Sequence, residues 1–141
     1  MLIEDLPFED DFFDAVVSIV TIDFVYDVFK CVRQINRVLV PHGQLILAVA
    51  NHAYLLNRIK LLMGKLPTSS AIPRAHWPTM GWDAGAMHYF TQETLTETLA
   101  HCGFRTDTIK GAGIFVGLKD LRPALLSGTL VISARAEKQG N

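Results

Sequence analysis

Four polar side chains that could do chemistry follow two apolar runs of the sequence. Thr21 and Asp23 come at the end of the first run, and Asn51 and His52 follow the second. If both runs are parallel strands, their carboxyl ends share the sheet edge where open α/β sheets bind ligands. His52 and Asp23 are then candidate catalytic bases, because imidazole and carboxylate groups accept protons near neutral pH. The alternative is that Asn51 and Asp23 cap helices and that His52 is solvated.

A second candidate group lies in or just after a long segment that proline and glycine interrupt, residues 65–87. Its aromatic, histidine and acidic members are His76, Trp77, Trp82, Asp83, His88 and Tyr89. Long loops in compact domains are often functional, so we interpret the segment as an irregular lid over a small-molecule substrate. Its substrate-binding residues would be Trp77, Trp82, His88 and Tyr89, together with Thr21 and Asn51. The alternative is that the tryptophans only anchor the loop. No compact ligand spacing such as H-x-x-x-H is present, so no metal site is predicted.

The elements that must position these side chains follow from hydrophobic periodicity. Ala15 to Ile22 is an almost continuous β-branched run, typical of a strand buried on both faces. From Tyr26 to Leu39 the apolar residues recur at helical spacing, and Pro41-His42-Gly43 ends that helix. Gln44 to Ala50 is a second buried strand. The sequence therefore predicts a β-α-β unit, preceded by a solvated acidic turn that contains Glu9, Asp10, Asp11 and Asp14.

The second half of the chain continues the α/β pattern. Helical spacing covers residues 52–63, and Gly64 is the expected stop. Thr91 is a plausible N-cap of a helix that runs to about His101. Strands are expected at Phe104 to Lys110 and at Thr129 to Ala136. Gly111 to Gly117 resembles a dinucleotide fingerprint, but its third glycine is one position late, so we interpret it as a connection between these strands.

Composition excludes several classes of protein. The chain has 141 residues, of which 50% are hydrophobic and 19% charged, with a net charge of −1. This is typical of one globular domain, and scattered basic residues give no footprint for nucleic acid. The longest apolar stretch is broken by Asp23, Asp27 and Lys30, so no membrane span is predicted. Cys31 and Cys102 are expected to be buried free thiols, and the predicted location is cytoplasmic.

The motifs resemble those of class I S-adenosylmethionine (SAM)-dependent methyltransferases of the small-molecule type. The run from Leu6-Pro7-Phe8 through Phe13-Asp14 resembles the family's lead into its fourth strand, and Arg37-Val38-Leu39 with Pro41-His42-Gly43 the turn into its fifth. His88 to Phe104 resembles the helix before the sixth strand. The resemblance implies a Rossmann-like sheet in which the seventh strand, Thr129 to Ala136, inserts antiparallel between the fifth and sixth.

The same resemblance implies that the cofactor-binding half of the family fold is missing from these residues. The family's glycine-rich loop and ribose-binding acid would precede Met1, and Leu2 stands where an adenine-binding aspartate is usual. After the fourth strand, Asp23-Phe24 replaces the frequent acidic-histidine pair. His42-Gly43 replaces the usual Gly-Gly turn. No cofactor-binding residue is therefore assigned, and SAM binding by this chain alone is doubtful.

The expectation is a single partial methyltransferase domain, residues 1–141, that transfers a methyl group to a small molecule but is inactive alone. Three origins stay open: a truncated gene or misplaced start, one part of a split enzyme, or a degenerate member kept for binding. A non-catalytic binding or oligomerisation module is the alternative function. Expected partners are the methyl acceptor and either the missing half or a second copy at the open edge of the first strand. Neither nucleic acid nor membrane is expected.

Overall fold

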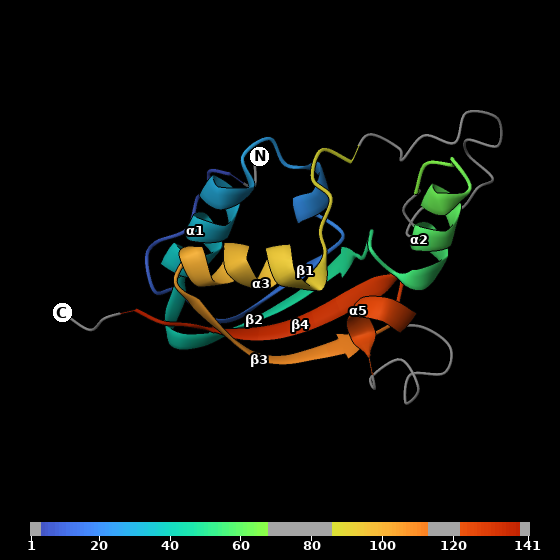
Figure 1. The fold of residues 1–141 in the computed structure, drawn as a ribbon. Coiled ribbons are helices and arrows are strands. Elements are labelled where there is room, and N and C mark those ends of the chain that lie inside the picture. The colour runs from blue at the N-terminus through green and yellow to red at the C-terminus, as the bar shows by residue number, and fades with distance from the viewer. Residues whose placement is uncertain (1–3, 68–85, 113–121, 139–141) are drawn as a thin grey trace.

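A four-stranded open sheet carries helices on one face in the computed structural model (Figure 1). The structure describes residues 4–67, 86–112 and 122–138. The strands are β1 (Phe13–Ile19), β2 (Leu39–Ala50), β3 (Phe104–Gly111) and β4 (Thr129–Ala136). The helices are α1 (Val28–Val38), α2 (Leu55–Leu62), α3 (Gln92–His101) and α5 (Pro123–Leu126), with a short 3-10 helix at Ile22–Phe24.

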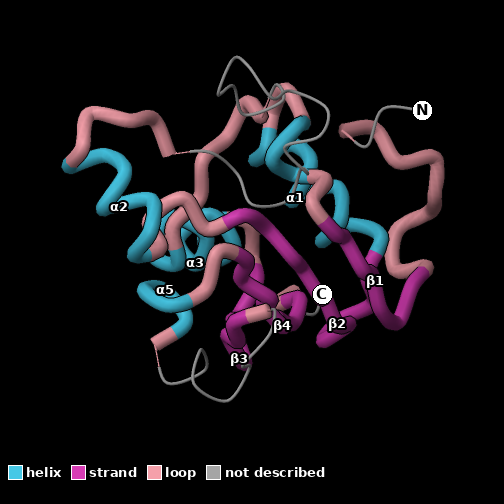
Figure 2. Tube along the Cα trace, turned by 90° about the vertical axis from the view of Figure 1, so that its right-hand side faces the viewer, coloured by secondary structure: helices cyan, strands magenta, loops and turns pink. Residues whose placement is uncertain are grey.

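The strand order confirms the predicted partial methyltransferase sheet. The order is β1-β2-β4-β3, with β1 parallel to β2 and β4 antiparallel to both of its neighbours (Figure 2). In the register, Val17 lies opposite Ile46 and Leu47 opposite Ile132. The last strand of the chain is thus inserted in reverse between two earlier ones, as the family resemblance implies.

The core lies between the sheet and the two helices α1 and α3, which cover the same face in Figure 1. Alternate residues of the two central strands point into it, because side chains of a strand alternate between faces. From β2 and β4 these are Leu45, Leu47, Val49, Leu130 and Ile132, and from the helices they include Val32, Ile35, Leu95 and Leu99. Each such side chain stabilises the fold by about 1.5–3 kcal/mol relative to exposure.

Helix α1 begins two residues later than its periodicity predicts. The Asp27 side chain accepts a hydrogen bond from the backbone N–H of Lys30 at 2.8 Å, which makes Asp27 the N-cap. The helix ends at Val38 and the chain enters β2 at once, so this strand begins at Leu39 instead of Gln44. His42 turns the chain with a positive φ of 63°, which the sequence could not show.

Strand β1 is shifted relative to the prediction of residues 15–22. It begins at Phe13 and ends at Ile19, because Val20 has a φ of 49° and turns the chain out of the sheet. A β-branched residue in this left-handed region is strained. Thr21 and Asp23 therefore lie in the turn and the 3-10 helix beyond the strand rather than on the strand itself.

The later elements follow the sequence closely. Helix α3 is capped by Thr91 as predicted, and Thr94 completes a reciprocal capping box. Strand β4 has its predicted bounds, β3 is one residue longer than predicted, and α2 begins only after Tyr54. Gly64 ends the α2 turn with a φ of 70°. Helix α5 was not predicted; it begins at Pro123, and proline suits the first turn of a helix.

Both cysteines are free and buried, as expected. Burial raises the pKa of the Cys31 thiol to about 11 and also raises the pKa of Cys102. Within the described ranges, every helix is too short or too polar to cross a bilayer.

Candidate functional site

The residues just before α3 join the carboxyl ends of β1 and β2. The backbone N–H groups of Met87 and His88 donate to the carbonyl of Asp23 at 2.8 and 3.1 Å. Two residues later, the carbonyl of Phe90 accepts from the N–H of His52 at 3.0 Å, and Phe90 forms a β-bridge with Asn51. The carboxyl ends of β1 and β2 therefore share one sheet edge, as predicted, and residues 87–90 join them there, which was not predicted.

His52 and Tyr89 form the more exposed part of this edge. Their rings meet edge to face with centroids 4.6 Å apart, which fixes the plane of the imidazole. Tyr89 is exposed and His52 is half-buried. A partly accessible histidine against an aromatic ring can accept a proton from a bound hydroxyl or acidic carbon.

His88, Thr21 and Asp23 form the inner part of the edge. A ring nitrogen of His88, Nε2, lies 2.9 Å from the carbonyl oxygen of Val25, and the Thr21 hydroxyl donates to the carbonyl of Ile19 at 3.0 Å. Asp23 is only 1% exposed, so its carboxylate does not face solvent. The structure therefore gives these three residues a role in the turn after β1, and it does not show their polar groups turned toward a ligand.

Asn51 is a structural anchor. Its side-chain N–H groups donate to the carbonyls of Ala124 and Ser127 at 2.9 and 2.8 Å, and its oxygen accepts from the N–H of Ala53. It is 2% exposed. The amide thus fixes α5 and the start of β4 against the end of β2, which the sequence could not reveal because its partners lie more than 70 residues away.

The remaining predicted residues, Trp77 and Trp82, lie outside the described residues, as do His76 and Asp83. The interpretation of residues 65–87 as a lid is therefore still a prediction. Among the described residues there is no group of histidine, cysteine or acidic side chains that could hold a metal ion.

The predicted open edge of β1 is present, and it carries an apolar groove that was not predicted. The groove has a volume of about 300 Å³ and is lined by Leu6, Phe8, Phe13, Ala15, Val16, Val17, Ser18, Thr21, Ile35 and Val38. Among the described strands β1 pairs only with β2, and its Val17 and Ile19 are 60% and 66% exposed. The continuous apolar sequence of β1 could have indicated this groove. Such a run is typical of a strand that other parts of the fold cover on both faces, whereas here much of β1 is exposed.

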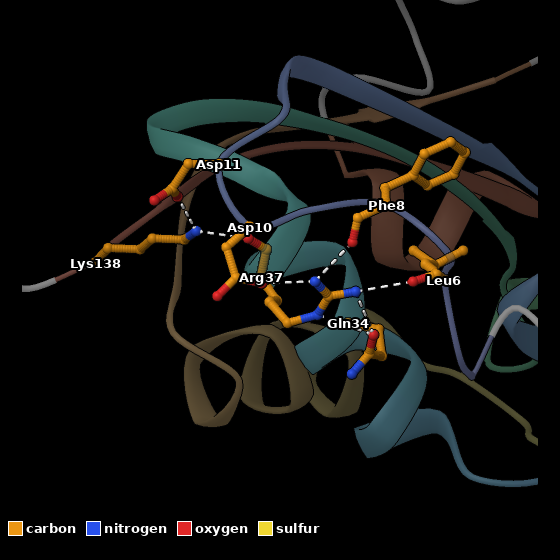
Figure 3. A network of polar contacts seen from close by, with 7 residues as sticks. All are labelled: Leu6, Phe8, Asp10, Asp11, Gln34, Arg37 and Lys138. Atoms are coloured by element: carbon orange, nitrogen blue, oxygen red, sulfur yellow. Dashed lines mark hydrogen bonds and ion pairs between the residues drawn. The ribbon is translucent and has the colours of Figure 1, made fainter.

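Arg37 holds the leading acidic turn beside this groove (Figure 3). Its guanidinium donates to the carbonyls of Leu6 and Phe8 at 2.9 and 2.8 Å and to the carboxylate of Asp10 at 2.6 Å. Lys138 pairs with Asp11 and donates to the Arg37 carbonyl. The turn is exposed, as predicted. It is also held by hydrogen bonds and ion pairs to Arg37 of α1 and to Lys138, which follows β4.

The comparisons with known proteins agree with this architecture. Residues 1–47 match the family model described as a methyltransferase domain. No curated protein matches the sequence. Many matched crystal structures are described as SAM-dependent methyltransferases.

Three of these structures show the range of the fold. A SAM-dependent methyltransferase of Methanosarcina mazei is 24% identical, with a TM-score of 0.66, and the match covers 99% of this chain and 66% of that one. A methyltransferase of Haloferax volcanii, solved in complex with the Trm112 methyltransferase activator, is 16% identical, with 98% and 60% covered and a TM-score of 0.63. The [4+2]-cyclase SpnF is 18% identical, with 99% and 55% covered and a TM-score of 0.61.

The resemblance to class I SAM-dependent methyltransferases is thus confirmed for the fold and for the leading motifs. This chain spans about 60% of the length of the first structures that it matches. Because one fold hosts several chemistries, as SpnF illustrates, the reaction must be argued from the site.

Proposed function

We propose that these residues form the acceptor-side part of a SAM-dependent methyltransferase that acts on a small molecule. The observation that carries the proposal is the join between Met87–Phe90 and the carboxyl ends of β1 and β2, which gathers His52, His88 and Tyr89 at one edge. Ligands of open α/β sheets bind at that edge. The reversed β4 and the family match at residues 1–47 support the same assignment.

The residues present do not fit the whole cofactor. The connections that leave β1 and β2, residues 20–21 and 51–54, contain no glycine that would let a backbone approach a ligand closely. Asp23, which follows β1, is too buried to accept hydrogen bonds from ribose hydroxyls. We therefore assign SAM binding mainly to residues other than those described, and we derive no step through the cofactor.

The proposed role of these residues is to align the acceptor and to receive its proton. His52 is the candidate base, and Tyr89 is the positioning residue that fixes its ring. Asp23 and His88 support the turn on which the acceptor would rest, through their backbone and side-chain bonds. An amine acceptor needs this base less than a hydroxyl or acidic carbon does.

Complementation tests this proposal. The amino-terminal strands of the Methanosarcina mazei structure would be joined to this chain, and release of S-adenosylhomocysteine would be measured with a small-molecule extract as the pool of acceptors. We expect release that falls about 10²–10⁴-fold with His52→Gln. Release should be unchanged with Arg105→Lys, at an exposed position near the opposite end of the sheet. A folded chimera that binds SAM but releases no product would contradict the proposal.

A second candidate function is a binding or oligomerisation module, which the exposed edge of β1 favours. An apolar strand with a free edge pairs readily with another chain. The Haloferax volcanii structure shows that this fold accommodates a protein partner. Size-exclusion chromatography with light scattering would give a discrete dimer or hetero-complex that Val17→Lys dissociates. Polydisperse aggregate would argue against such a module. The cytoplasmic location stays a prediction under both functions.

A further inference from the structure

Helix α2 presents its apolar face to solvent. Along it, Leu55, Ile59 and Leu62 follow the i, i+4, i+7 spacing of one helix face, and Leu56 and Met63 continue the stripe beside them. These five side chains are 41–88% exposed, and Leu61 and Leu66 are exposed as well. A surface helix normally turns such a stripe toward the core. The observed orientation is therefore the reverse of the ordinary one.

The side that α2 turns away from solvent is marked by a polar residue, and the polar contacts of Asn57 and Arg58 are local. Asn57 is the buried residue of α2, at 1% exposure, and its oxygen lies 3.4 Å from the Lys60 ammonium. The Arg58 guanidinium donates to the carbonyl of Ala53 at 2.6 Å. Asn57 thus marks the covered side of α2, and the stripe of Leu55, Ile59 and Leu62 lies on the opposite, exposed side.

The charged side chains within this segment have one sign. Arg58, Lys60 and Lys65 lie in α2 or just after it, and the sequence contains no acidic residue between Asp27 and Asp83. An apolar helix face with cations in the same segment is complementary to a surface that is both apolar and anionic. The free edge of β1 lies on the other side of the molecule in Figure 2, so the two surfaces are separate.

We propose that α2 and the following turn, residues 55–66, dock on an anionic lipid membrane surface. The helix lies flat, with Leu55, Ile59 and Leu62 in the acyl boundary and the cations among the headgroups. It does not span the bilayer, since eight helical residues extend only about 12 Å. The inference goes beyond the proposed methyl transfer and does not depend on it.

Vesicle co-sedimentation of the full chain, without cofactor, tests the proposal. Phosphatidylcholine vesicles with phosphatidylglycerol should pellet the protein, and pure phosphatidylcholine vesicles should bind it at least about tenfold more weakly. Leu62→Glu should weaken binding by about tenfold or more, and Lys65→Glu by about fivefold or more. Both side chains are exposed, so the fold should persist by circular dichroism.

Two matched controls distinguish binding through α2 from non-specific binding through other exposed apolar side chains. Tyr26→Glu changes another strongly exposed apolar side chain, at 82% exposure, and Val17→Lys changes the β1 edge. Both should bind anionic vesicles like the parent chain. Equal binding to neutral and anionic vesicles, full binding by Leu62→Glu, or no binding at all would overturn the proposal. Loss of a lipid-free dimer by Leu62→Glu would instead assign the face to a second copy.

Discussion

Arg37 links three parts of the molecule that are distant in sequence. It lies in the last turn of α1, and its guanidinium donates hydrogen bonds to the carbonyls of Leu6 and Phe8. Its own carbonyl accepts a hydrogen bond from the Lys138 ammonium. Two backbone carbonyls therefore depend on one guanidinium (Figure 3). Because the held turn borders the β1 groove, Arg37 determines the shape of that edge.

Arg37→Ala should lower the free energy of unfolding by about 1–3 kcal/mol, since it leaves the carbonyls of Leu6 and Phe8 without their charged donor. Urea denaturation measures the change. Arg33→Ala, at an exposed position of the same helix, is the control and should change stability by less than about 0.5 kcal/mol. Equal effects of the two substitutions would show that the Arg37 contacts contribute little.

The turn at His42 and Gly43, within the first part of β2, should respond with opposite signs at these two adjacent positions. His42 has a φ of 63°, so His42→Gly should leave stability unchanged or raise it by up to about 1 kcal/mol. A Cβ on Gly43 would lie 2.8 Å from the carbonyl oxygen of Val40, so Gly43→Ala should lower stability by about 1–3 kcal/mol. Thermal denaturation measures both, and a stabilising Gly43→Ala would refute this turn geometry.

The Cys31 thiol should make stability fall in alkaline solution. Its pKa is about 11 in the folded protein and 9.0 when exposed, so the unfolded chain loses the proton first as pH rises. The folding free energy contributed by the neutral buried thiol is complete below pH 9.0 and declines toward pH 11. Cys31→Ala should remove this part of the decline in chemical denaturation curves. If the free energy of unfolding fell equally steeply with pH in parent and variant over this range, the decline would not come from Cys31.

At the scale of elements, the bounds that depend on local pattern were predictable. Thr91 as N-cap and β4 at Thr129–Ala136 follow from residue types close in sequence. The end of β1 was not predictable. Val20 ends it with a left-handed backbone conformation, but valine is β-branched and its residue type favours a strand. The outward face of α2 was also hidden, since periodicity shows that a helix has an apolar face but not which way the face points.

The docking of α5 against the end of β2 should depend on one amide. Asn51→Ala removes the donors to the carbonyls of Ala124 and Ser127, so it should cost about 1–3 kcal/mol and lower hydrogen-exchange protection of Leu125–Ser127. Gln44→Ala, which removes an exposed side-chain bond to Ser133, is the control and should leave that protection unchanged. Unchanged protection in Asn51→Ala would reopen a substrate-binding role for Asn51.

At the scale of the whole molecule, the sheet leaves apolar surface exposed along the open side of β1. The matched structures extend beyond the match by roughly a third or more of their length, and β1 exposes Val17 and Ile19 on its open side. The family motifs predicted this open edge of β1. The sequence analysis did not predict the basic surface of α2, because a net charge of −1 over the whole chain conceals a segment of 55 residues without an acid.

Calorimetric titration of SAM tests the central claim, that these residues are the acceptor side of a methyltransferase fold and hold little of its cofactor site. Into the 141-residue chain alone, we expect no measurable heat of binding. Into the chimera that carries the amino-terminal strands of the Methanosarcina mazei structure, we expect saturable binding. Micromolar binding by the chain alone would contradict the account, because it would place the cofactor site within these 141 residues.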